Sequence, residues 1–286
     1  MVLAGVLLEL AVVVATMLVT ATLVFVGPRR FTTALREFRP RVRACALSLS
    51  VLAGVLFVRW STQDVMPWLS WRIIGQNITP YIYALERTVF GENPVLVLQS
   101  FQTPELTSFF VFVYIYGYAF LLSFPFIAYF ALEETDYLST LIVAFTANYG
   151  IGLVCYALFI AYGPRNFDNI AFDGLLYETV PQYGYLTHTV NQSVNVFPSL
   201  HTSLSVTVFL LAWLTREEYP LWVPVAGVLA GSVVLSTMYL GIHWFSDVVA
   251  GTILAAVSVH IGVNYTVEGV LESARRSLEG GIPPGG

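Results

Sequence analysis

The sequence has few charged residues, no lysine and only two cysteines. Charged residues make up 11% of the 286 residues, whereas an ordinary soluble domain has about 25%. Together with a hydrophobic content of 57%, this scarcity excludes a soluble fold of ordinary composition. All 13 basic residues are arginine, and outside one arginine-rich stretch they form no basic patch, which excludes a nucleic-acid-binding surface. Cys45 and Cys155 both fall inside predicted helices and indicate neither a disulfide framework nor a metal motif.

Long apolar runs are the main structural feature of the sequence. Runs of about 17 to 25 mostly apolar residues recur, each long enough to cross about 30 Å of hydrocarbon as a helix. They predict an all-α membrane protein, a polytopic bundle of about seven transmembrane helices. The predicted spans are residues 3–26, 43–59, 107–131, 137–161, 200–215, 220–240 and 246–264. The first is interpreted as a helix and not as a signal peptide, because it is too long and lacks a basic start.

The charge pattern predicts an orientation in the cell membrane. Six arginines between residues 29 and 43 mark the first loop as cytoplasmic, and an odd number of spans places the C-terminus on the same side. We expect an N-terminal hairpin with an interfacial loop segment (1–106), a helical core (107–264) and a cytoplasmic tail (265–286). Within the first part, residues 60–106 predict belt packing or a lid at the membrane surface, with a substrate contact as the alternative.

Three polar segments interrupt the apolar pattern at helix ends. They are residues 162–165 (Tyr-Gly-Pro-Arg), residues 197–203 (Phe-Pro-Ser-Leu-His-Thr-Ser) and residues 236–247, which run from Ser236 to Asp247. In the predicted topology the first ends the fourth span, the second begins the fifth, and the third joins the sixth to the seventh. All three therefore emerge at one face, which the orientation predicts to be extracellular.

The first two segments have features of an anion site. Pro198 and Ser199 stand where a helix begins, so free backbone N–H groups and the helix dipole can hold a phosphate. The Ser199 hydroxyl either adds a donor or only caps the helix. Arg165 supplies a fixed positive charge for phosphate, the alternative being an arginine that extends to the interface from the end of a span.

The third segment contains a histidine and a carboxylate that can act together. His243 and Asp247 are four residues apart, which places them on one face of a helix if the helix begins by His243. The carboxylate can accept from one ring nitrogen and leave the other free as a nucleophile, the alternative being a purely structural hydrogen bond. His201 at the same face can act as general acid and then as base, although a lone histidine at a helix start is often structural. We predict these three as the catalytic residues.

The same residues resemble the motifs of a known family. Pro-Ser-x-His followed by Ser-x6-His-x3-Asp is similar to the second and third signature motifs of the type 2 phosphatidic acid phosphatase superfamily, over roughly residues 107–264. The resemblance implies a helical catalytic core that needs no metal or other cofactor. It also implies that His243 attacks phosphorus to form a phosphohistidine, that Asp247 orients it and that His201 is the general acid and base.

Departures from the family pattern indicate a particular branch. Leu200 replaces the usual glycine of the second motif, Thr237 replaces an arginine of the third, and the lysine-containing first motif is absent. Residues 162–165 and the Phe-Pro-Ser-Leu-His sequence resemble those of a branch that includes inositol phosphorylceramide synthases, which transfer a phosphorylated headgroup between lipids. Because a phosphodiester carries less charge than a phosphomonoester, the loss of two cations favours a diester substrate.

The sequence therefore predicts an integral membrane enzyme that acts on lipid phosphoesters. Arg165, Ser199 and Ser236 are the expected phosphate ligands, and headgroup transfer from a lipid phosphoester to a lipid alcohol is the expected reaction. The alternative is a lipid phosphate phosphatase that hydrolyses phosphatidic acid or polyprenyl phosphate. A transporter or an inactive membrane scaffold is the alternative of another class. Against a transporter, the ionisable residues cluster at one face, and no pair of broken helices repeats between the two halves.

Four further polar residues are expected to have structural roles. His188, in the loop before the second motif, is interpreted as a surface histidine, with a substrate contact as the alternative. Asn148 and Asn264 are expected to form hydrogen bonds across helices. His260, deep in the last span, is expected to be a hydrogen-bonded packing residue.

Overall fold

The chain folds as a bundle of helices. The computed structural model describes residues 2–73, 75–167, 172–180 and 196–279, and outside the helices of these residues one isolated β-bridge joins Asn77 to Ile160. His188 lies outside the described residues. The predicted all-α, multi-pass membrane fold is confirmed. Among the described residues five helices are long and apolar enough to cross a membrane, or six if one bent pair counts as a single span, where the sequence predicts about seven.

Each of the seven predicted spans corresponds to a helical segment. Five qualify as spans by themselves: Ala4–Val26, Pro104–Phe130, Asp136–Leu158 (α10), Trp222–Tyr239 (α14) and Phe245–Asn264 (α15). The first of these combines most of α1 (Val2–Ala21) with a π-helical end. The second combines α8 (Pro104–Phe112), a π-helical turn and α9 (Tyr118–Phe130).

The other two predicted spans differ from simple straight helices. The second is a pair, α3 (Phe38–Ala44) and α4 (Ala46–Thr62), bent by 64°. Arg41 of α3 is buried and donates to the carbonyl groups of Phe130, at 3.0 Å, and Leu132 at the end of α9. These bonds satisfy carbonyl groups that a helix end leaves free, and they hold α3 across the end of the bundle. The fifth predicted span, α13 (Leu200–Leu214), is a shorter apolar helix of 15 residues.

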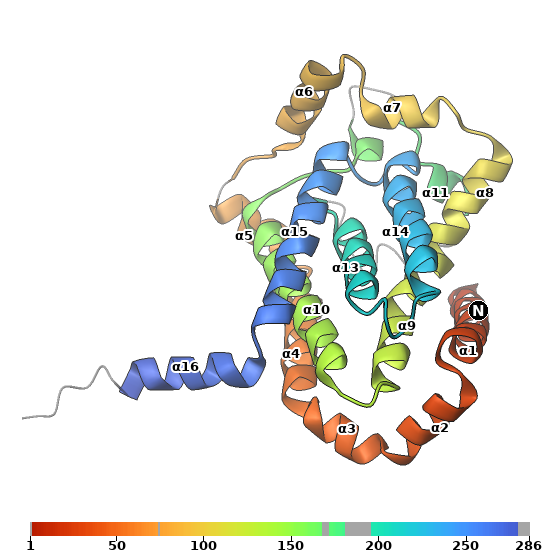
Figure 1. Cartoon of the computed structure of the whole chain (residues 1–286). Coiled ribbons are helices and arrows are strands. Elements are labelled where there is room, and N and C mark those ends of the chain that lie inside the picture. The colour runs from red at the N-terminus through yellow and green to blue at the C-terminus, as the bar shows by residue number, and fades with distance from the viewer. Residues whose placement is uncertain (1, 74, 168–171, 181–195, 280–286) are drawn as a thin grey trace, which may run out of the picture.

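This short helix, α13, is the centre of the bundle. It packs against α9, α10, α14 and α15 (Figure 1), and Leu204 and Leu211 on it are buried. Polar side chains of α13 such as Ser203 and Thr207 are buried as well and therefore need partners inside the bundle. Asn148 of α10 donates to the Thr207 hydroxyl of α13 at 3.0 Å and accepts from the Ser203 hydroxyl, which confirms the predicted bond across helices.

The prediction for the end of the last span was wrong. Asn264 donates to the His260 carbonyl at 2.8 Å within the same helix, and both residues are exposed. Val259 and Gly262 of the same turns are buried, so His260 and Asn264 lie on the outer face of α15 and do not pack inside the bundle. The following helix, α16 (Val267–Glu279), extends away from the bundle (Figure 1).

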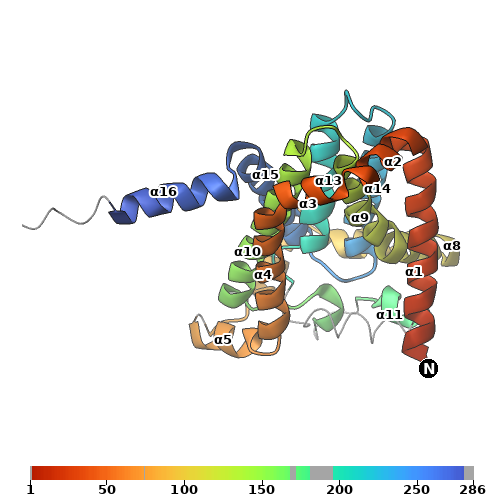
Figure 2. The same ribbon diagram turned by 90° about the horizontal axis from the view of Figure 1, so that it is seen from below.

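The two ends of the bundle carry different segments. The arginine-rich helices α2 (Pro28–Arg36) and α3 lie at one end, which Figure 2 views from below. At the other end, the predicted loop 60–106 contains three short helices, α5 (Met66–Ile73), α6 (Thr79–Phe90) and α7 (Pro94–Gln99). The turn between α14 and α15 lies at this second end (Figure 1), which therefore holds the polar segment with His243.

Candidate active site

The turn between α14 and α15 presents His243. Gly241 adopts a φ of +72°, a conformation that favours glycine because it has no Cβ. The backbone N–H groups of Ile242 and His243 both donate to the Thr237 carbonyl, each at 3.0 Å. The chain therefore reverses directly after α14 and places His243 immediately before the first turn of α15.

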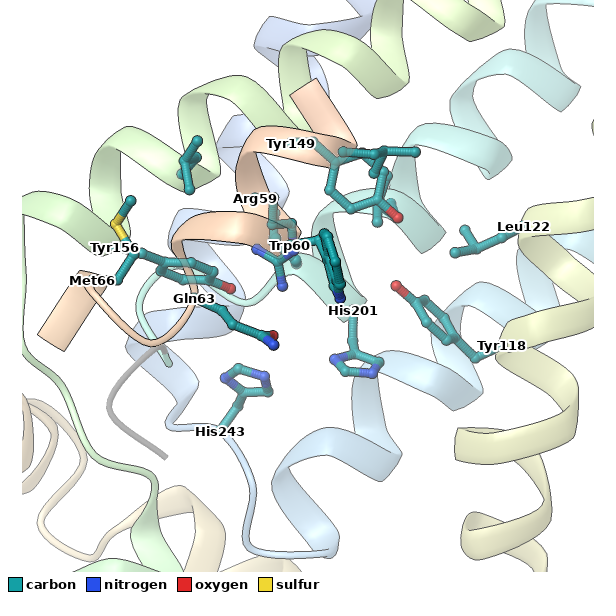
Figure 3. A pocket seen from close by; sticks show the side chains of 14 residues that line it. Arg59, Trp60, Gln63, Met66, Tyr118, Leu122, Tyr149, Tyr156, His201 and His243 are labelled. Carbon is teal, nitrogen blue, oxygen red and sulfur yellow. The ribbon is translucent and has the colours of Figure 1, made fainter. Parts of the chain in front are cut away.

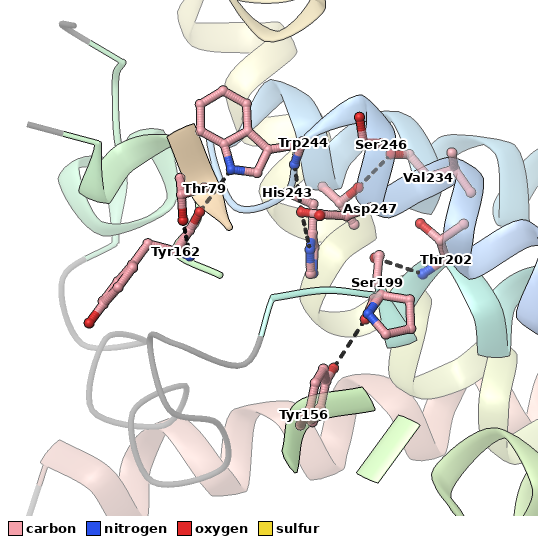
Figure 4. Close-up of polar contacts among 12 residues, drawn as sticks. Thr79, Tyr156, Tyr162, Ser199, Thr202, Val234, His243, Trp244, Ser246 and Asp247 are labelled. Carbon is pink, nitrogen blue, oxygen red and sulfur yellow. Dashed lines mark hydrogen bonds and ion pairs between the residues drawn. The ribbon is translucent and has the colours of Figure 1, made fainter. Parts of the chain in front are cut away.

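Asp247, in that first turn, holds the His243 ring. One carboxylate oxygen lies 3.3 Å from His243 Nδ1 and accepts from the Trp244 backbone N–H at 2.9 Å (Figure 4). Both side chains of the pair are buried. When Nδ1 donates to this carboxylate, Nε2 carries the free lone pair, which is the tautomer that a nucleophilic imidazole needs.

The surroundings of His243 favour its neutral form. Burial lowers the pKa of the His243 imidazole to about 3, and the positive charge of Arg165 acts in the same direction. The ring is therefore neutral at physiological pH and available for nucleophilic attack.

The first polar segment, residues 162–165, packs on the same turn. Gly163 touches it so closely that an added Cβ would lie 2.3 Å from the Ile242 carbonyl oxygen. Two residues later, the Arg165 backbone N–H donates to the Gly241 carbonyl at 3.2 Å. This close packing explains why Arg165, far from His243 in sequence, is near enough to affect its charge state.

The Arg165 guanidinium has one nitrogen that lacks a partner. Its Cζ lies 4.7 Å from the centroid of the Tyr177 ring, a cation–π contact. Nη1 is buried and, among the described residues, has no hydrogen-bond acceptor. Since buried donors are nearly always satisfied, an anion at this position would complete the site. The geometry is therefore compatible with the predicted phosphate contact of Arg165.

The second polar segment begins α13 against the start of α15. The Ser199 hydroxyl accepts from the Thr202 N–H at 3.3 Å, and the Ser199 N–H donates to the Asp247 carbonyl at 3.1 Å (Figure 4). Gly251 of α15 permits this contact, because a Cβ there would lie 2.5 Å from the Ser199 carbonyl oxygen. Ser199 thus caps α13, and its predicted phosphate contact stays a prediction.

His201 faces His243 across a cavity of about 450 Å³ (Figure 3). The two ring centroids are 6.1 Å apart. His201 also packs against Tyr114 and Tyr118, with ring centroids at 4.6 and 4.4 Å. The aromatic contacts hold the imidazole in its position opposite His243. A group bound in the cavity can therefore contact both histidines.

The rest of the cavity wall is largely apolar and aromatic. It is formed by Leu56, Leu122, Leu153, Leu200 and Leu204, by Tyr118, Tyr149 and Tyr156, and by Arg59, Trp60, Gln63 and Met66. A mostly apolar wall with a few convergent polar groups suits a ligand that has an apolar part and a polar head.

Ser236 and Thr237 lie at the end of α14, away from this wall. Their hydroxyls donate to the carbonyl groups of Val233 and Val234 in the same helix, at 2.6 and 2.7 Å, and both side chains are fully buried. The hydroxyls are thus engaged in the helix itself. The phosphate contact predicted for Ser236 stays a prediction.

Sequence reasoning missed Glu86 of α6, which anchors the start of α15. One carboxylate oxygen of Glu86 accepts from the Ser246 N–H at 2.7 Å and from its hydroxyl at 2.9 Å, and the other accepts from the Asn93 amide at 2.9 Å. Burial raises the pKa of Glu86, and the negative charge of Asp247 also raises it. Glu86 thereby fixes the turn of α15 that carries Asp247. Its sequence position, in a segment expected at the membrane surface, gave no indication of this contact.

Arg59 was also missed. It ends the second predicted span, where an arginine is typical of a side chain that extends to the interface. In the structure it lines the cavity beside both histidines.

Comparison with known proteins gives one family. The family model described as the PAP2 superfamily matches residues 80–261, whereas no curated protein and no solved structure gives a significant match. The matched region begins in α6 and therefore includes the Glu86 anchor as well as His201, His243 and Asp247. It covers more than half of the chain, and the chain thus belongs to the PAP2 superfamily.

Proposed function

We propose that the protein transfers or hydrolyses lipid phosphoesters through a phosphohistidine formed on His243. The observation that carries the proposal is the buried His243–Asp247 pair, which faces His201 across a largely apolar cavity. Membership in the PAP2 superfamily supports a function of the lipid phosphatase or phosphotransferase type.

The proposed reaction has two steps. His243 Nε2 attacks phosphorus, an N–P bond forms, and the bond from phosphorus to the leaving alkoxide breaks while His201 donates a proton to that alkoxide. An anionic phosphoryl group between the rings favours the protonated form of His201 that this step needs. His201 then accepts a proton from water or an alcohol, whose oxygen attacks phosphorus and releases His243.

For the acceptor, we propose headgroup transfer of the inositol phosphorylceramide synthase type. The motif resemblance supports it, and Thr237, which stands where the family has an arginine, brings no charge. The alternative is a lipid phosphate phosphatase, which shares both steps but uses water as acceptor.

A comparison of two substrates tests this proposal. Purified protein is supplied with a lipid phosphomonoester or a lipid phosphodiester, with and without a lipid alcohol, while phosphate release and new lipid are measured together. We expect the diester to give a new lipid at least about tenfold faster than the monoester gives phosphate, a difference of about 1.4 kcal/mol in barrier. Rapid phosphate release from the monoester, with no new lipid under any acceptor, would refute transfer and leave the phosphohistidine mechanism intact.

For location, we propose that the protein lies in the cell membrane with the cavity toward the extracellular side and the C-terminus in the cytoplasm. The support is the position of the arginine-rich helices α2 and α3 at the end of the bundle away from α6 and α7 (Figure 1).

Cysteine labelling tests the orientation. The native Cys45 and Cys155 are replaced by alanine, and Ser100→Cys after α7 or Arg39→Cys in α3, both exposed positions, is added. We expect a membrane-impermeant thiol reagent to label Ser100→Cys on intact cells and Arg39→Cys only after permeabilisation. The reverse pattern would place the cavity on the cytosolic side.

A further inference from the structure

We propose that Arg59, which lies outside the family-matched residues, is a second phosphate-binding cation of the site. This inference rests on the proposed function for its ligand, a phosphoryl anion. Arg59 is in the last turn of α4 and lines the same cavity as His201 and His243 (Figure 3). The residues before the family-matched region, residues 1–79, would then contribute a phosphate-binding side chain to the site.

Two tyrosines of α10 direct the Arg59 side chain. Its Cζ lies 5.4 Å from the ring centroid of Tyr156 and 5.9 Å from that of Tyr149. The Tyr156 hydroxyl donates in turn to the Pro198 carbonyl at 3.3 Å, just before α13 (Figure 4). Cation–π contacts hold a guanidinium in place without neutralising its charge, so the positive charge remains available to a ligand.

The charge of Arg59 is not matched by a nearby acid. Within the part of the chain that the structure describes, no carboxylate forms a salt bridge with Arg59, and Asp247 is engaged with His243 and Trp244. Arg59 is half-buried at this largely apolar wall, so water screens its charge only in part and an anion in the cavity is attracted to it. A phosphoryl group suits this position, because a guanidinium can bind two of its oxygens at once.

The position of Arg59 complements that of Arg165. Arg59 reaches the cavity from α4, whereas Arg165 reaches the turn of His243 from the segment after α10. Arg59 would thus replace one of the two cations that the family motifs supply and that this sequence lacks. Since electrostatic attraction grows with charge, the contribution of Arg59 is larger for a doubly charged phosphomonoester than for a singly charged diester.

Substitution of Arg59 tests the inference with a phosphate analogue. The affinity of full-length protein for orthovanadate is measured for the wild type, Arg59→Gln, Arg59→Lys and a control, Arg72→Gln. Arg72 is exposed on α5 and contacts the Trp68 ring at 5.2 Å, outside the cavity. We expect Arg59→Gln to weaken orthovanadate binding about 10- to 100-fold, because a hydrogen bond to a charged group is lost. Arg59→Lys should recover most of the affinity, and the control should bind as the wild type does.

The outcomes separate this inference from the proposed function. Unchanged orthovanadate binding in Arg59→Gln, or no binding by the wild type, would overturn the inference. An equal loss of affinity and of melting temperature in Arg59→Gln and Arg59→Lys would also overturn it, because it would indicate a structural role. If Arg59→Gln alone loses affinity while the wild type turns over no lipid phosphoester, the cation site stands and the proposed function fails. With active protein, KM should rise more for the monoester than for the diester.

Discussion

Replacing His243 by alanine is expected to abolish both turnover and covalent phosphate labelling. Among the described cavity residues, no other side chain combines an imidazole nitrogen with an orienting carboxylate. The rate should fall about 10⁴-fold or more, the scale observed when a catalytic nucleophile is removed from an enzyme. The measurement uses a lipid labelled with ³²P in the phosphate, a rapid alkaline quench, and a count of acid-labile phosphate bound to the protein.

The matched control for this experiment is His260→Ala. His260 lies on α15 as well, but it is exposed and bonds only within its own helix turn, to Asn264. We expect His260→Ala to keep the label and the rate of the wild type. An adduct that persists in His243→Ala would move the nucleophile to another residue, with His201 as the first to be tested.

Asp247→Asn is expected to leave the fold intact and to slow the reaction by about 10²- to 10⁴-fold. An asparagine oxygen at the position of Oδ2 can still accept from both the Trp244 N–H and His243 Nδ1, which keeps the turn at the start of α15. The amide carries no negative charge, so it stabilises the positive charge that develops on the His243 ring during attack less than the carboxylate does. The fall in rate therefore measures the charge of Asp247 and not the loss of its hydrogen bonds.

Two measurements distinguish this effect of the lost charge from damage to the fold. Single-turnover rates report formation of the phosphohistidine, and thermal unfolding reports the stability of the variant. Asp247→Ala serves as the comparison, since it removes the acceptor of the Trp244 N–H as well and should lower both the rate and the melting temperature. A near wild-type rate in Asp247→Asn would show that the negative charge of Asp247 is not needed for the attack of His243.

Much of the bundle was predictable because the length of an apolar run is a strong indicator of a membrane-spanning helix. A bilayer accepts a helix only when its backbone groups bond internally, so long apolar runs identify spans with little dependence on their neighbours. For the same reason the order of spans brings the first and third polar segments together, and the contact of Gly163 with Ile242 agrees with this prediction. The spacing of His243 and Asp247 also predicted their contact, but for another reason than one helical face. Because α15 begins at Phe245, Asp247 in its first turn reaches back past the N-cap residue Trp244 to the His243 ring.

Contacts that depend on tertiary packing were not predictable from the pattern. The sequence interpretation used Arg41 only as a charge of the cytoplasmic loop, yet its buried guanidinium donates to the Phe130 carbonyl at the end of α9. Glu86 and Arg59 look like surface and interface residues in sequence, because charge alone does not show which way a side chain turns. Ser236 is the opposite case. Its position in the motif predicts a phosphate contact, whereas in the structure its hydroxyl donates to the Val233 carbonyl in the preceding helical turn.

The length of α13 bears on the competition between water and lipid for the phosphohistidine. Its 15 residues make a helix about 22 Å long, about 8 Å less than the hydrocarbon thickness. If its C-terminal end reaches one interface, the end with His201 lies beneath the opposite headgroup level. A reaction centre at that depth is supplied with hydroxyl groups by lateral diffusion of lipids and with water only through the protein. If the reaction follows the proposed phosphohistidine, the ratio of new lipid to free phosphate would depend on access to that intermediate. Widening the cavity would then favour hydrolysis without any change to the histidines.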